Sequence, residues 1–371
     1  MTSPGLEHFY SVIPAGGVGS RLWPLSRADA PKFLHDLTGS GQTLLRDTWD
    51  RLAPLSGDQR IMVVTGRAHR AAVEAQLPEL RDPNVVLESE PRDSSAAIGL
   101  AAAILVRREP DVIIGSFAAD HVIGKQKKFA KAVTEAVSVA NAGYISLIGI
   151  TPTEPATGFG YIHFGAPHEI PGAPSARMVD RFVEKPGLET AKSYLDEGSY
   201  LWNASMFIAR ADVLLAQLGE TEPELLDGLL QLAASWDTPT RGAVVDRVWP
   251  TLKKVAIDYA VAEPAAAAGR VVVIPGDFDW DDVGDFASIA KLHAGGRKSD
   301  LAILGEDARV LADSSTGVVI SQGKRLISLI GVTDIVVVDT EDALLVTTTA
   351  NAQRVKAVVD ALKLSGRNEV L

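Results

Sequence analysis

The 371-residue chain contains no cysteine. This absence excludes disulfide bonds, thiolate metal sites and a cysteine nucleophile, and it suits a reducing compartment. Serine, histidine and acidic residues do not form a recognisable hydrolase triad, so covalent catalysis by a side chain is not indicated.

The sequence also lacks a hydrophobic run long enough to cross a membrane. Its longest apolar stretch, AAIGLAAAILV at 96–106, is shorter than the roughly 20 residues that a bilayer requires. The N-terminus, MTSPGLEHFYSVIPAGG, has neither the basic region nor the long apolar core of a signal peptide. We therefore expect a cytoplasmic protein with no membrane partner.

Positive charge is in deficit, because 36 lysines and arginines face 47 aspartates and glutamates and give a formal net charge of −11. Such a surface repels phosphate polymers at long range, so a nucleic-acid partner is not expected. A small phosphate ligand would need a local cluster of basic groups.

The length predicts two domains rather than one, which we place at residues 1–293 and 294–371. The first part alternates β-branched runs with Ala/Leu-rich stretches, which predicts an α/β domain with a largely parallel sheet. Ligands in such folds bind beyond the carboxyl ends of the strands. The expected strands are 9–13, 61–65, 85–87, 112–115 and 145–150, and the expected helices are 68–77, 96–108 and 128–141.

The pattern changes after about residue 290. The segment AGGRKSD at 294–300 is a plausible linker, and short strands separated by turn residues follow it. The final stretch has one apolar helical face, with Asn351 as a possible N-cap and Gly366 past the end. The short strands are expected at 310–312, 318–321, 326–330, 335–338 and 344–347.

A glycine-rich loop follows the first expected strand, in the sequence VIPAGGVGSRLWPLSRADAPKFL at 12–34. Its glycines allow backbone N–H groups to approach an anion. Leu22 stands where a dinucleotide fold needs a third glycine, and the loop lacks the Gly-Lys-Ser/Thr of a Walker A motif. Arg21 and Lys32 remain as phosphate-binding candidates, although a turn-rich linker with surface charges would look similar.

Two acidic segments could hold a metal. Asp120 follows an expected strand, and the stretch DFDWDDVGDF at 277–286 concentrates five aspartates. Mg²⁺ prefers such oxygen ligands. A lone aspartate is more often a turn residue, and the acidic stretch alone would read as a solvated loop without the glycine and distal glutamate of an EF-hand.

The glycine loop resembles the signature of the sugar-1-phosphate nucleotidyltransferases, Gly-Gly-x-Gly-x-Arg-Leu-x-Pro followed by Pro-Lys. Trp23 and the sequence PLSR make it similar to the mannose-1-phosphate guanylyltransferase branch, and further matches extend over nearly the whole chain. The resemblance implies a Rossmann-like nucleotidyltransferase domain with a mixed, mostly parallel sheet, followed by a short left-handed β-helix domain.

The resemblance also assigns the nucleotide and metal residues. Asp120 and Asp282 match the family's two metal-binding aspartates and imply a Mg²⁺ cofactor, while Arg21, Lys32 and Lys185 would be the catalytic cations. The implied nucleotide-binding residues are Ala15, Gly16, Gly17, Gly19, Ser20, Arg21, Lys32, Arg92, Asp93, Ser94 and Asp120.

Other matching motifs imply a sugar-phosphate site. RFVEKP at 181–186 resembles the family's Val-Glu-Lys-Pro, and the alternation of a strand would place Glu184 and Lys185 on opposite sides. WNASMF at 202–207 matches the family except that Ser205 replaces a glycine. A surface ion-pair strand is the plainer explanation of RFVEKP. The glycines of TGFGYIHF at 157–164 would suit close backbone approach to a flat ring, and a β-bulge explains them equally well. The implied sugar-phosphate-binding residues are Gly158, Gly160, Glu184, Lys185, Asn203 and Asp258.

The base-reading residues are not defined by the motifs. Guanine presents two adjacent donors that one carboxylate could accept together. The segment LESEPRDSSAAI at 87–98 contains Glu88, Glu90 and Asp93, but it carries Asp93 and Ser94 where the family has Asn and Thr.

The resemblance implies the reaction of GTP with mannose 1-phosphate to give GDP-mannose and pyrophosphate. The open alternatives are another pair of substrates, such as glucose 1-phosphate with dTTP or UTP, and a non-catalytic protein that senses nucleotide sugars. We also expect a homodimer, because the short strands of the tail expose edges that need cover.

Overall fold

A computed structural model describes residues 5–293, 301–305 and 308–371, so the expected linker at 294–300 lies outside the described residues. Its contacts divide the chain into two compact units. The domain boundary between 293 and 294 stays a prediction, because it falls beside residues that are not described. Unit 1 comprises Met1–Ala15, Thr48–Ala119 and Ile123–Trp280, and unit 2 comprises Gly16–Asp47, Asp120–Val122 and Asp281–Leu371.

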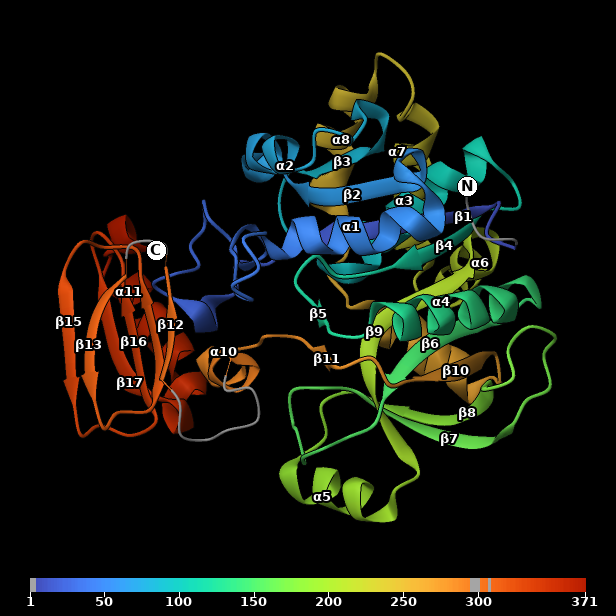
Figure 1. The fold of residues 1–371 in the computed structure, drawn as a ribbon. Helices are drawn as coiled ribbons and strands as arrows, with labels where there is room; N and C mark the ends of the chain where they lie inside the picture. The colour runs from blue at the N-terminus through green and yellow to red at the C-terminus, as the bar shows by residue number, and fades with distance from the viewer. Residues whose placement is uncertain (1–4, 294–300, 306–307) are drawn as a thin grey trace. The chain divides into compact units, whose positions relative to one another are not determined.

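Unit 1 is built on one mixed sheet, which has the order β3-β2-β1-β4-β9-β6-β10-β8-β7 in the described chain (Figure 1). The ladders among β3, β2, β1 and β4 and between β6 and β10 are parallel, as the sequence predicts. The strands are β1 (Phe9–Ala15), β2 (Ile61–Gly66), β3 (Val85–Glu88), β4 (Ile113–Ser116), β6 (Ile145–Ile150), β7 (Tyr161–Pro167), β8 (Arg177–Val183), β9 (Tyr200–Arg210) and β10 (Val271–Gly276).

Antiparallel pairing enters this sheet through two strands, β8 and β9. The long strand β9 runs antiparallel to β4, β6 and β7, and β8 runs antiparallel to β7 and β10. The mixed, mostly parallel sheet is therefore confirmed, because seven of its nine strands share one direction and β8 and β9 run against them.

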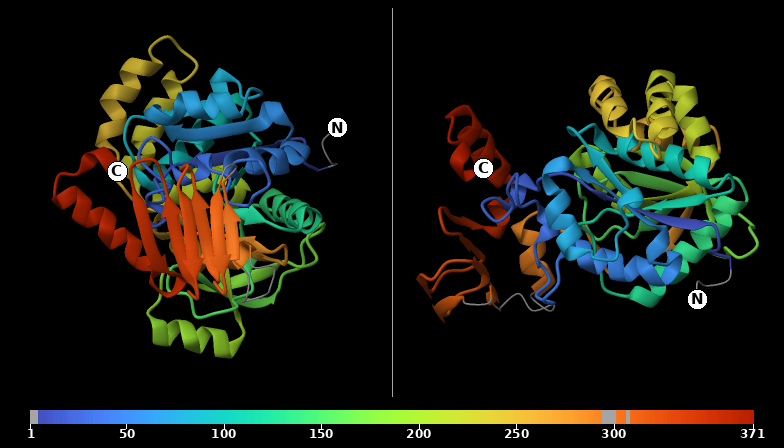
Figure 2. Two further views of the ribbon diagram at one scale, coloured as in Figure 1. Left: turned by 60° about the vertical axis from the view of Figure 1, so that its left-hand side comes forward. Right: turned by 90° about the horizontal axis from the view of Figure 1, so that it is seen from above.

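Helices cover both faces of the sheet of unit 1 (Figure 2). Helices α3 and α6 contact it on one face, with α7 packed on α3, and α4 contacts it on the other face. The helices of the chain are α1 (Leu44–Ser56), α2 (Arg70–Gln76), α3 (Asp93–Arg108), α4 (Gln126–Asn141), α5 (Leu188–Glu197), α6 (Ala211–Thr221), α7 (Pro223–Ser235), α8 (Arg241–Val248), α9 (Glu263–Ala267), α10 (Phe286–His293) and α11 (Val355–Leu364).

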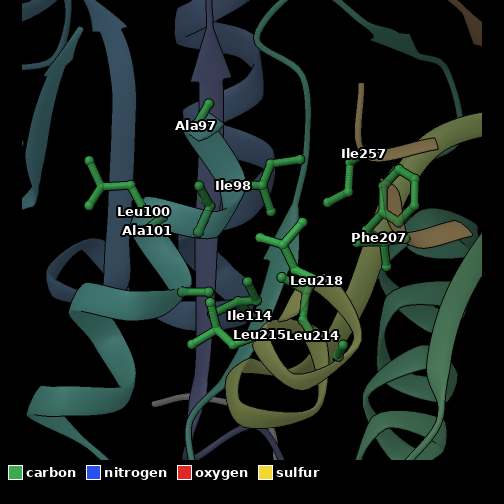
Figure 3. Packing of buried hydrophobic residues seen from close by; sticks show 14 of the residues in the cluster. Ala97, Ile98, Leu100, Ala101, Ile114, Phe207, Leu214, Leu215, Leu218 and Ile257 are labelled. Carbon is green, nitrogen blue, oxygen red and sulfur yellow. The ribbon is translucent and has the colours of Figure 1, made fainter. Parts of the chain in front are cut away.

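The main core of unit 1 lies around α3. This helix is rich in alanine and is buried along most of its length, so its small side chains allow the sheet and α6 to approach closely. Figure 3 shows Ile98 and Leu100 of α3 among Ile114 of β4, Phe207 of β9 and leucines of α6. No helix in the described ranges is both long and apolar enough to span a membrane.

Unit 2 contains the β-helix that the family resemblance implies. Successive strands alternate between the sheet β12-β14-β16-β17 and the sheet β13-β15, and neighbouring coils pair in parallel. The last strand, β17, reverses and pairs antiparallel with β16. The strands are β12 (Leu301–Leu304), β13 (Arg309–Asp313), β14 (Gly317–Ser321), β15 (Leu326–Ile330), β16 (Ile335–Asp339) and β17 (Leu344–Thr348).

The C-terminal helix begins later than predicted. Residues Thr349–Arg354 form a 3₁₀ helix, η8, and Arg354 precedes α11, so the prediction of Asn351 as its N-cap is wrong. Gly366 adopts a φ of 71° just past the end of α11, as expected for a residue that ends a helix.

Candidate active site

The glycine loop begins where β1 ends, at Ala15, and continues into a short 3₁₀ helix, η1 (Ser20–Leu22). Gly19 has a φ of 74°, and a Cβ atom built there would lie 2.7 Å from Cβ of Lys32. The Lys32 amide donates to the Val18 carbonyl at 3.3 Å. The glycine is therefore required by the close approach of Lys32, which holds the loop in its turn.

Arg21 is exposed, and no hydrogen bond or ion pair of its guanidinium occurs within the described residues. Gly16 and Gly17 are exposed as well. Loop amides and an unpaired guanidinium are the groups that a polyphosphate would engage. The predicted phosphate role of this loop thus has donors available to it.

Lys32 joins two distant parts of unit 2. Its side chain is 8% exposed, and Nζ donates to Oδ2 of Asp120 at 2.8 Å. The same ammonium donates to the backbone carbonyl of Asp282. The structure therefore brings together three of the predicted site residues, Lys32, Asp120 and Asp282.

The charge of this ammonium influences the pKa values of both carboxylates. Burial would raise the pKa of Asp120, but the positive charge of Lys32 holds it below its ordinary value. Burial raises the pKa of Asp282 to about 6, and the charges of Asp281 and Asp120 add to the effect while Lys32 opposes it. Two acidic groups with one cation between them leave unbalanced negative charge in this part of the site.

The donor set of Asp120 and Asp282 fits a magnesium ion. Mg²⁺ is commonly held by one or two carboxylates, with substrate phosphates and water completing its coordination. The described residues form no cluster of three or more acidic or histidine ligands. The pair could therefore hold a metal only together with a ligand that supplies further oxygens.

The backbone beside Asp282 is strained. Val283 is fully buried and has a φ of 45°, which is unfavourable for a β-branched residue. Oδ1 of Asp281 accepts a hydrogen bond from the Val283 amide at 2.7 Å, which supports this conformation. Strain of this kind is concentrated at functional segments, because only the surrounding structure maintains it.

The remaining acidic residues of 277–286 have other partners. Asp277 pairs with Lys128, and Asp279 pairs with Lys125 at 2.7 Å. Two lysines thus neutralise the first aspartates of this acidic stretch. Asp285 instead accepts the amides of Ala287 and Ser288, at the start of α10.

A second group of predicted residues lies in unit 1, just beyond β8. Glu184 is 7% exposed and accepts a hydrogen bond from Nζ of Lys185. Lys185 has a φ of 47°, so the chain leaves the strand here and the two side chains meet. The prediction that they point to opposite sides of a strand is wrong, because β8 ends at Val183. Burial would lower the pKa of Lys185, but the contact with Glu184 outweighs it and raises the pKa.

Asn203 and Asp258 form a buried pair near Glu184. Nδ2 of Asn203 donates to Oδ1 of Asp258 at 2.8 Å. Asp258 begins a turn of π-helix at Asp258–Ala262, a feature frequent at functional sites. Burial and the charge of Glu184 raise the pKa of Asp258 to about 6.

The two predicted glycines beside this group differ in their packing. A Cβ atom on Gly160 would lie 2.5 Å from Oε2 of Glu184, so the position of that carboxylate requires a glycine. A Cβ on Gly158 would meet nothing within 4 Å. Packing within the described chain thus explains Gly160 but not Gly158.

Ser205, which replaces the family's glycine, has a φ of 53°. Its amide donates to Oδ1 of Asn203 at 3.1 Å, so the backbone here fixes the orientation of the Asn203 amide group. To make this hydrogen bond the serine adopts a positive φ, which is unfavourable for a residue with a side chain and which glycine adopts freely.

The segment before α3 is held by internal contacts. The guanidinium of Arg92 donates to the carbonyls of Leu252 and Pro250 and pairs with Glu90. Oγ of Ser94 accepts the Ile257 amide at 2.9 Å, next to Asp258. Arg92 and Ser94 thus brace this segment, and their predicted contact with nucleotide stays a prediction. Asp93 has a φ of 68° and accepts the amide of Ser94 at 2.8 Å.

Glu88 was not among the predicted site residues. It ends β3 at the carboxyl edge of the parallel strands, and its register partner on β2 is Gly66. Burial and the charge of Asp93 raise its pKa to about 7. Its carboxylate makes no hydrogen bond within the described residues. The sequence could have indicated Glu88, because this residue lies at the end of an expected strand and in the segment considered for recognition of the base.

Comparison with known proteins identifies the family. The nucleotidyl transferase family model matches residues 10–299, and the MannoseP isomerase/GMP-like beta-helix domain model matches residues 307–362. The mannose-1-phosphate guanylyltransferase ManC of Salmonella typhimurium (strain LT2) is 36% identical over 367 residues, which cover 97% of this chain and 74% of that protein. The chain belongs to the nucleotidyl transferase family. This confirms the resemblance that the glycine loop indicated.

Two further relatives of this nucleotidyl transferase have similar coverage. The mannose-1-phosphate guanylyltransferase of Escherichia coli (strain K12) is 36% identical, over 97% of this chain and 74% of that protein. The xanthan biosynthesis protein XanB of Xanthomonas campestris pv. campestris (strain B100) is 36% identical, over 96% of this chain and 74% of that protein.

Solved structures confirm the fold of this nucleotidyl transferase. The crystal structure of mannose-1-phosphate geranyltransferase from Thermus thermophilus has a TM-score of 0.84 and 31% identity, and covers 96% of this chain and 99% of that chain. The mannose-6-phosphate isomerase from Helicobacter pylori has a TM-score of 0.59 at 20% identity, covering 74% of this chain and 99% of that chain, and it supports the fold alone.

Replacing Asp258 with asparagine tests the cost of its buried charge. Because its pKa is raised to about 6 in the folded protein, the folded state binds the proton more tightly, and this stabilisation is lost as the pH rises from about 4 to about 6. The free energy of unfolding of Asp258→Asn, minus that of wild type, should therefore increase by about 2 kcal/mol between pH 4 and pH 7. Urea unfolding at a series of pH values measures this difference.

The matched control is Asp212→Asn. Its hydrogen bond with Arg210 lowers the pKa of Asp212, so this variant should lose stability relative to wild type as the pH rises. Parallel pH curves for wild type and Asp258→Asn would contradict a buried, destabilising charge at Asp258.

Proposed function

We propose that the protein transfers the guanylyl group of GTP to mannose 1-phosphate, giving GDP-mannose and pyrophosphate. The observation that carries this proposal is the group formed by Lys32, Asp120 and Asp282, beside a glycine loop whose Arg21 has no polar partner among the described residues. The 36% identity to mannose-1-phosphate guanylyltransferases supports the choice of substrates.

The chemistry needs no protein nucleophile or general base. An oxygen of the sugar phosphate, already anionic, attacks the α-phosphorus of GTP in line. The new bond joins that oxygen to the α-phosphorus, and the bond from the α-phosphorus to the bridging oxygen of pyrophosphate breaks. Catalysis then consists of positioning two anions and compensating their charge.

We assign the triphosphate to the glycine loop and its cations. The exposed amides of the loop would bind phosphate oxygens, and the guanidinium of Arg21 would hold the departing pyrophosphate. Lys32, already fixed by two acceptors, would steady the phosphates at the reacting centre. Its fixed position matters, because an ammonium that does not have to reorganise contributes more to the transition state.

We propose Mg²⁺ as the metal, with Asp120 and Asp282 as its protein ligands. When bound, it supplies positive charge that offsets the negative charge of the phosphates. The raised pKa of Asp282 is in keeping with this role, because a buried carboxylate with another acidic group nearby gains most from a second cation.

We assign the sugar phosphate to the group in unit 1. Lys185 would bind its phosphate, while Glu184 and Asn203 would accept and donate hydrogen bonds to the sugar hydroxyls. Asp258 accepts a hydrogen bond from Nδ2 of Asn203, and the Ser205 amide donates to Oδ1 of Asn203, so both ends of the Asn203 amide group are held in place. Gly160 keeps the space that the Glu184 carboxylate occupies.

We propose that Glu88 reads the guanine base. Its carboxylate is free of hydrogen bonds within the described chain, and one carboxylate can accept guanine N1–H and N2–H₂ together. The end of β3 lies two strands from the end of β1, where the glycine loop begins, and two strand spacings amount to roughly 10 Å. This separation is comparable to the distance from the α-phosphate to the base of a nucleotide.

We further propose that the protein works in the cytoplasm and that it forms a homodimer. The face shared by β13 and β15 exposes Leu311, Leu326 and Ile330 by 65%, 66% and 77%. A second copy of the same face is an occupant of matching chemistry, because apolar strands of this exposure gain by mutual cover.

The substrate pair is tested by pyrophosphate release. GTP with mannose 1-phosphate should give the highest kcat/KM among combinations of GTP, UTP and dTTP with mannose 1-phosphate and glucose 1-phosphate. Asp282→Ala should lower kcat on the order of 10²–10³-fold, because it removes a charge-placing group at the reacting phosphates. Asp279→Ala, from the same acidic stretch but paired with Lys125, should keep the wild-type rate.

Two outcomes would contradict this proposal. Full activity of Asp282→Ala with an unchanged dependence on Mg²⁺ would remove Asp282 from the metal site. Nucleotide-sugar binding by the wild-type protein without pyrophosphate release from any pair would indicate a regulatory protein.

Glu88→Gln tests the reading of guanine against hypoxanthine. ITP lacks the exocyclic N2 amine, so wild type should prefer GTP. In Glu88→Gln one acceptor is replaced by a donor, and kcat/KM for GTP should fall about 10–100-fold while that for ITP falls less. The control Glu90→Gln, which loses only an ion pair with Arg92, should retain the preference. An equal loss for both nucleotides would contradict base reading by Glu88.

The dimer is tested by sedimentation velocity. Wild type should sediment as a dimer, and Ile330→Glu should sediment as a monomer, because it buries a charge in the proposed interface. Leu230→Glu changes an exposed leucine of α7 in unit 1 and should remain dimeric. A wild-type protein that stays monomeric at micromolar concentration would rule this interface out.

A further inference from the structure

The segment that carries Arg21 and Lys32 has little regular structure of its own. Between Gly16 and α1 the described elements are two short 3₁₀ helices, η1 and η2 (Lys32–Leu34). A loop of this length keeps one conformation only if other parts of the protein hold it. In unit 2 these contacts come largely from the C-terminal residues.

The apolar side of the loop belongs to the hydrophobic core of the β-helix. Leu22, Trp23 and Leu25 cluster with valines of β14 and β16 and with Val355 and Val359 of α11. Trp23 is 8% exposed, and its Nε1 donates to the carbonyl of Val370 at 2.6 Å. The loop is therefore packed as part of unit 2.

Arg27 adds a directional contact. Its Nη1 donates to Oδ2 of Asp342 at 2.8 Å, and its Nη2 to Oδ1 of the same carboxylate at 2.5 Å. The same side chain donates to Thr340 Oγ1 at 3.2 Å and, through Nε, to the carbonyl of Pro24 at 3.0 Å. A two-pronged ion pair fixes both distance and orientation, which a single contact does not.

Arg27 is linked to Lys32 through a tight turn. The amide of Arg27 donates to the carbonyl of Ala30 at 2.9 Å, which returns the chain towards Pro31. Lys32 follows this turn. A side chain on Gly19 would collide with its Cβ atom, and its amide donates to the Val18 carbonyl. Moving Arg27 would thus displace Lys32 relative to the glycine loop.

The C-terminal segment also contacts the chain beyond Asp282. Nε2 of Gln353, in η8, donates to Oδ2 of Asp285. Oδ1 of Asp285 accepts the Ala287 and Ser288 amides and so fixes the start of α10. One stretch of the tail, from Thr340 to Gln353, therefore contacts both the loop that carries Lys32 and the segment that follows Asp282.

We propose that Asp342 and Arg27 are positioning residues for nucleotidyl transfer, and that the C-terminal β-helix orders the phosphate-binding loop through them. The proposal rests on the function proposed above, since its effect is on the triphosphate. Neither residue needs to touch substrate. Their ion pair sets the conformation in which Arg21 and Lys32 meet the phosphates.

The test compares two ion pairs in each of which an arginine donates two hydrogen bonds to one aspartate. Asp342→Asn removes the charge that anchors Arg27. Asp237→Asn does the same to Arg108, whose Nε and Nη2 reach the Asp237 carboxylate at 3.0 and 2.8 Å. The arginines are 15% and 23% exposed and the aspartates 45% and 57%, so both variants should lose similar stability.

Asp342→Asn should lower kcat/KM for GTP about 10-fold and weaken GTP binding in calorimetry by a similar factor, while KM for mannose 1-phosphate changes less than about twofold. Asp237→Asn should match wild type in all three quantities. The exchanged pair, Arg27→Asp with Asp342→Arg, should recover more activity than Arg27→Asp alone, because it restores the attraction with the opposite polarity.

The outcomes separate this proposal from the function on which it rests. If wild type releases pyrophosphate and Asp342→Asn has the same activity, the positioning role is overturned and the proposed function stands. The same conclusion follows if Asp237→Asn is as impaired as Asp342→Asn. Wild type that neither binds GTP nor releases pyrophosphate overturns both.

Discussion

The ammonium of Lys32 is the interaction on which the phosphate part of the site depends. It lies between the carboxylate of Asp120 and the carbonyl of Asp282, and is almost fully buried. A buried charge is tolerated only when it is paired and hydrogen-bonded, so the positions of both acidic residues and of the ammonium fix one another. The same side chain explains the glycine at position 19, because its Cβ occupies the space of any larger residue. The Lys32 side chain thus influences both the shape of the glycine loop and the ionisation of the nearby carboxylates.

The group in unit 1 is organised on a different electrostatic principle. Glu184 and Asp258 are both buried, and Lys185 pairs with the first while the neutral amide of Asn203 binds the second. Asp258 responds with a raised pKa, whereas Asp120 beside Lys32 has a lowered one. A network of mixed donors and acceptors suits hydroxyl groups, and a cation held between a carboxylate and a backbone carbonyl suits phosphate. Positive φ at Lys185 and Ser205 indicates that this network is maintained against the local preference of the chain.

Much of the fold follows from local patterns in the sequence. The strand at Ile145–Ile150 has the predicted limits, and β1, β2 and β3 exceed theirs by one or two residues at the carboxyl end, because a buried apolar run is visible without knowledge of its partners. The same patterns could not show that β9 runs antiparallel between parallel strands, or that Asn351 lies in a 3₁₀ turn. They also placed Glu184 and Lys185 on a strand, since a positive φ at a lysine has no sequence signal. The motifs named candidate site residues, but they could not show which contacts those residues make. Arg27 and Asp342 are 315 residues apart, and Glu88 differs from other glutamates only through its burial beside Asp93.

The grouping of the glycine loop with the β-helix has a physical reason in the task of the loop. In the function proposed above, the loop presents amides and an arginine to a soluble polyphosphate, so it cannot bury that side of itself. Its order must then come from the opposite side, where Leu22, Trp23 and Leu25 need an apolar partner. The β-helix supplies one with β14 and β16, whose valines pack in register along parallel ladders and give a rigid surface. A domain without a single predicted catalytic residue is thereby tied to catalysis, because the entropy of ordering the phosphate loop is offset in the core of that domain.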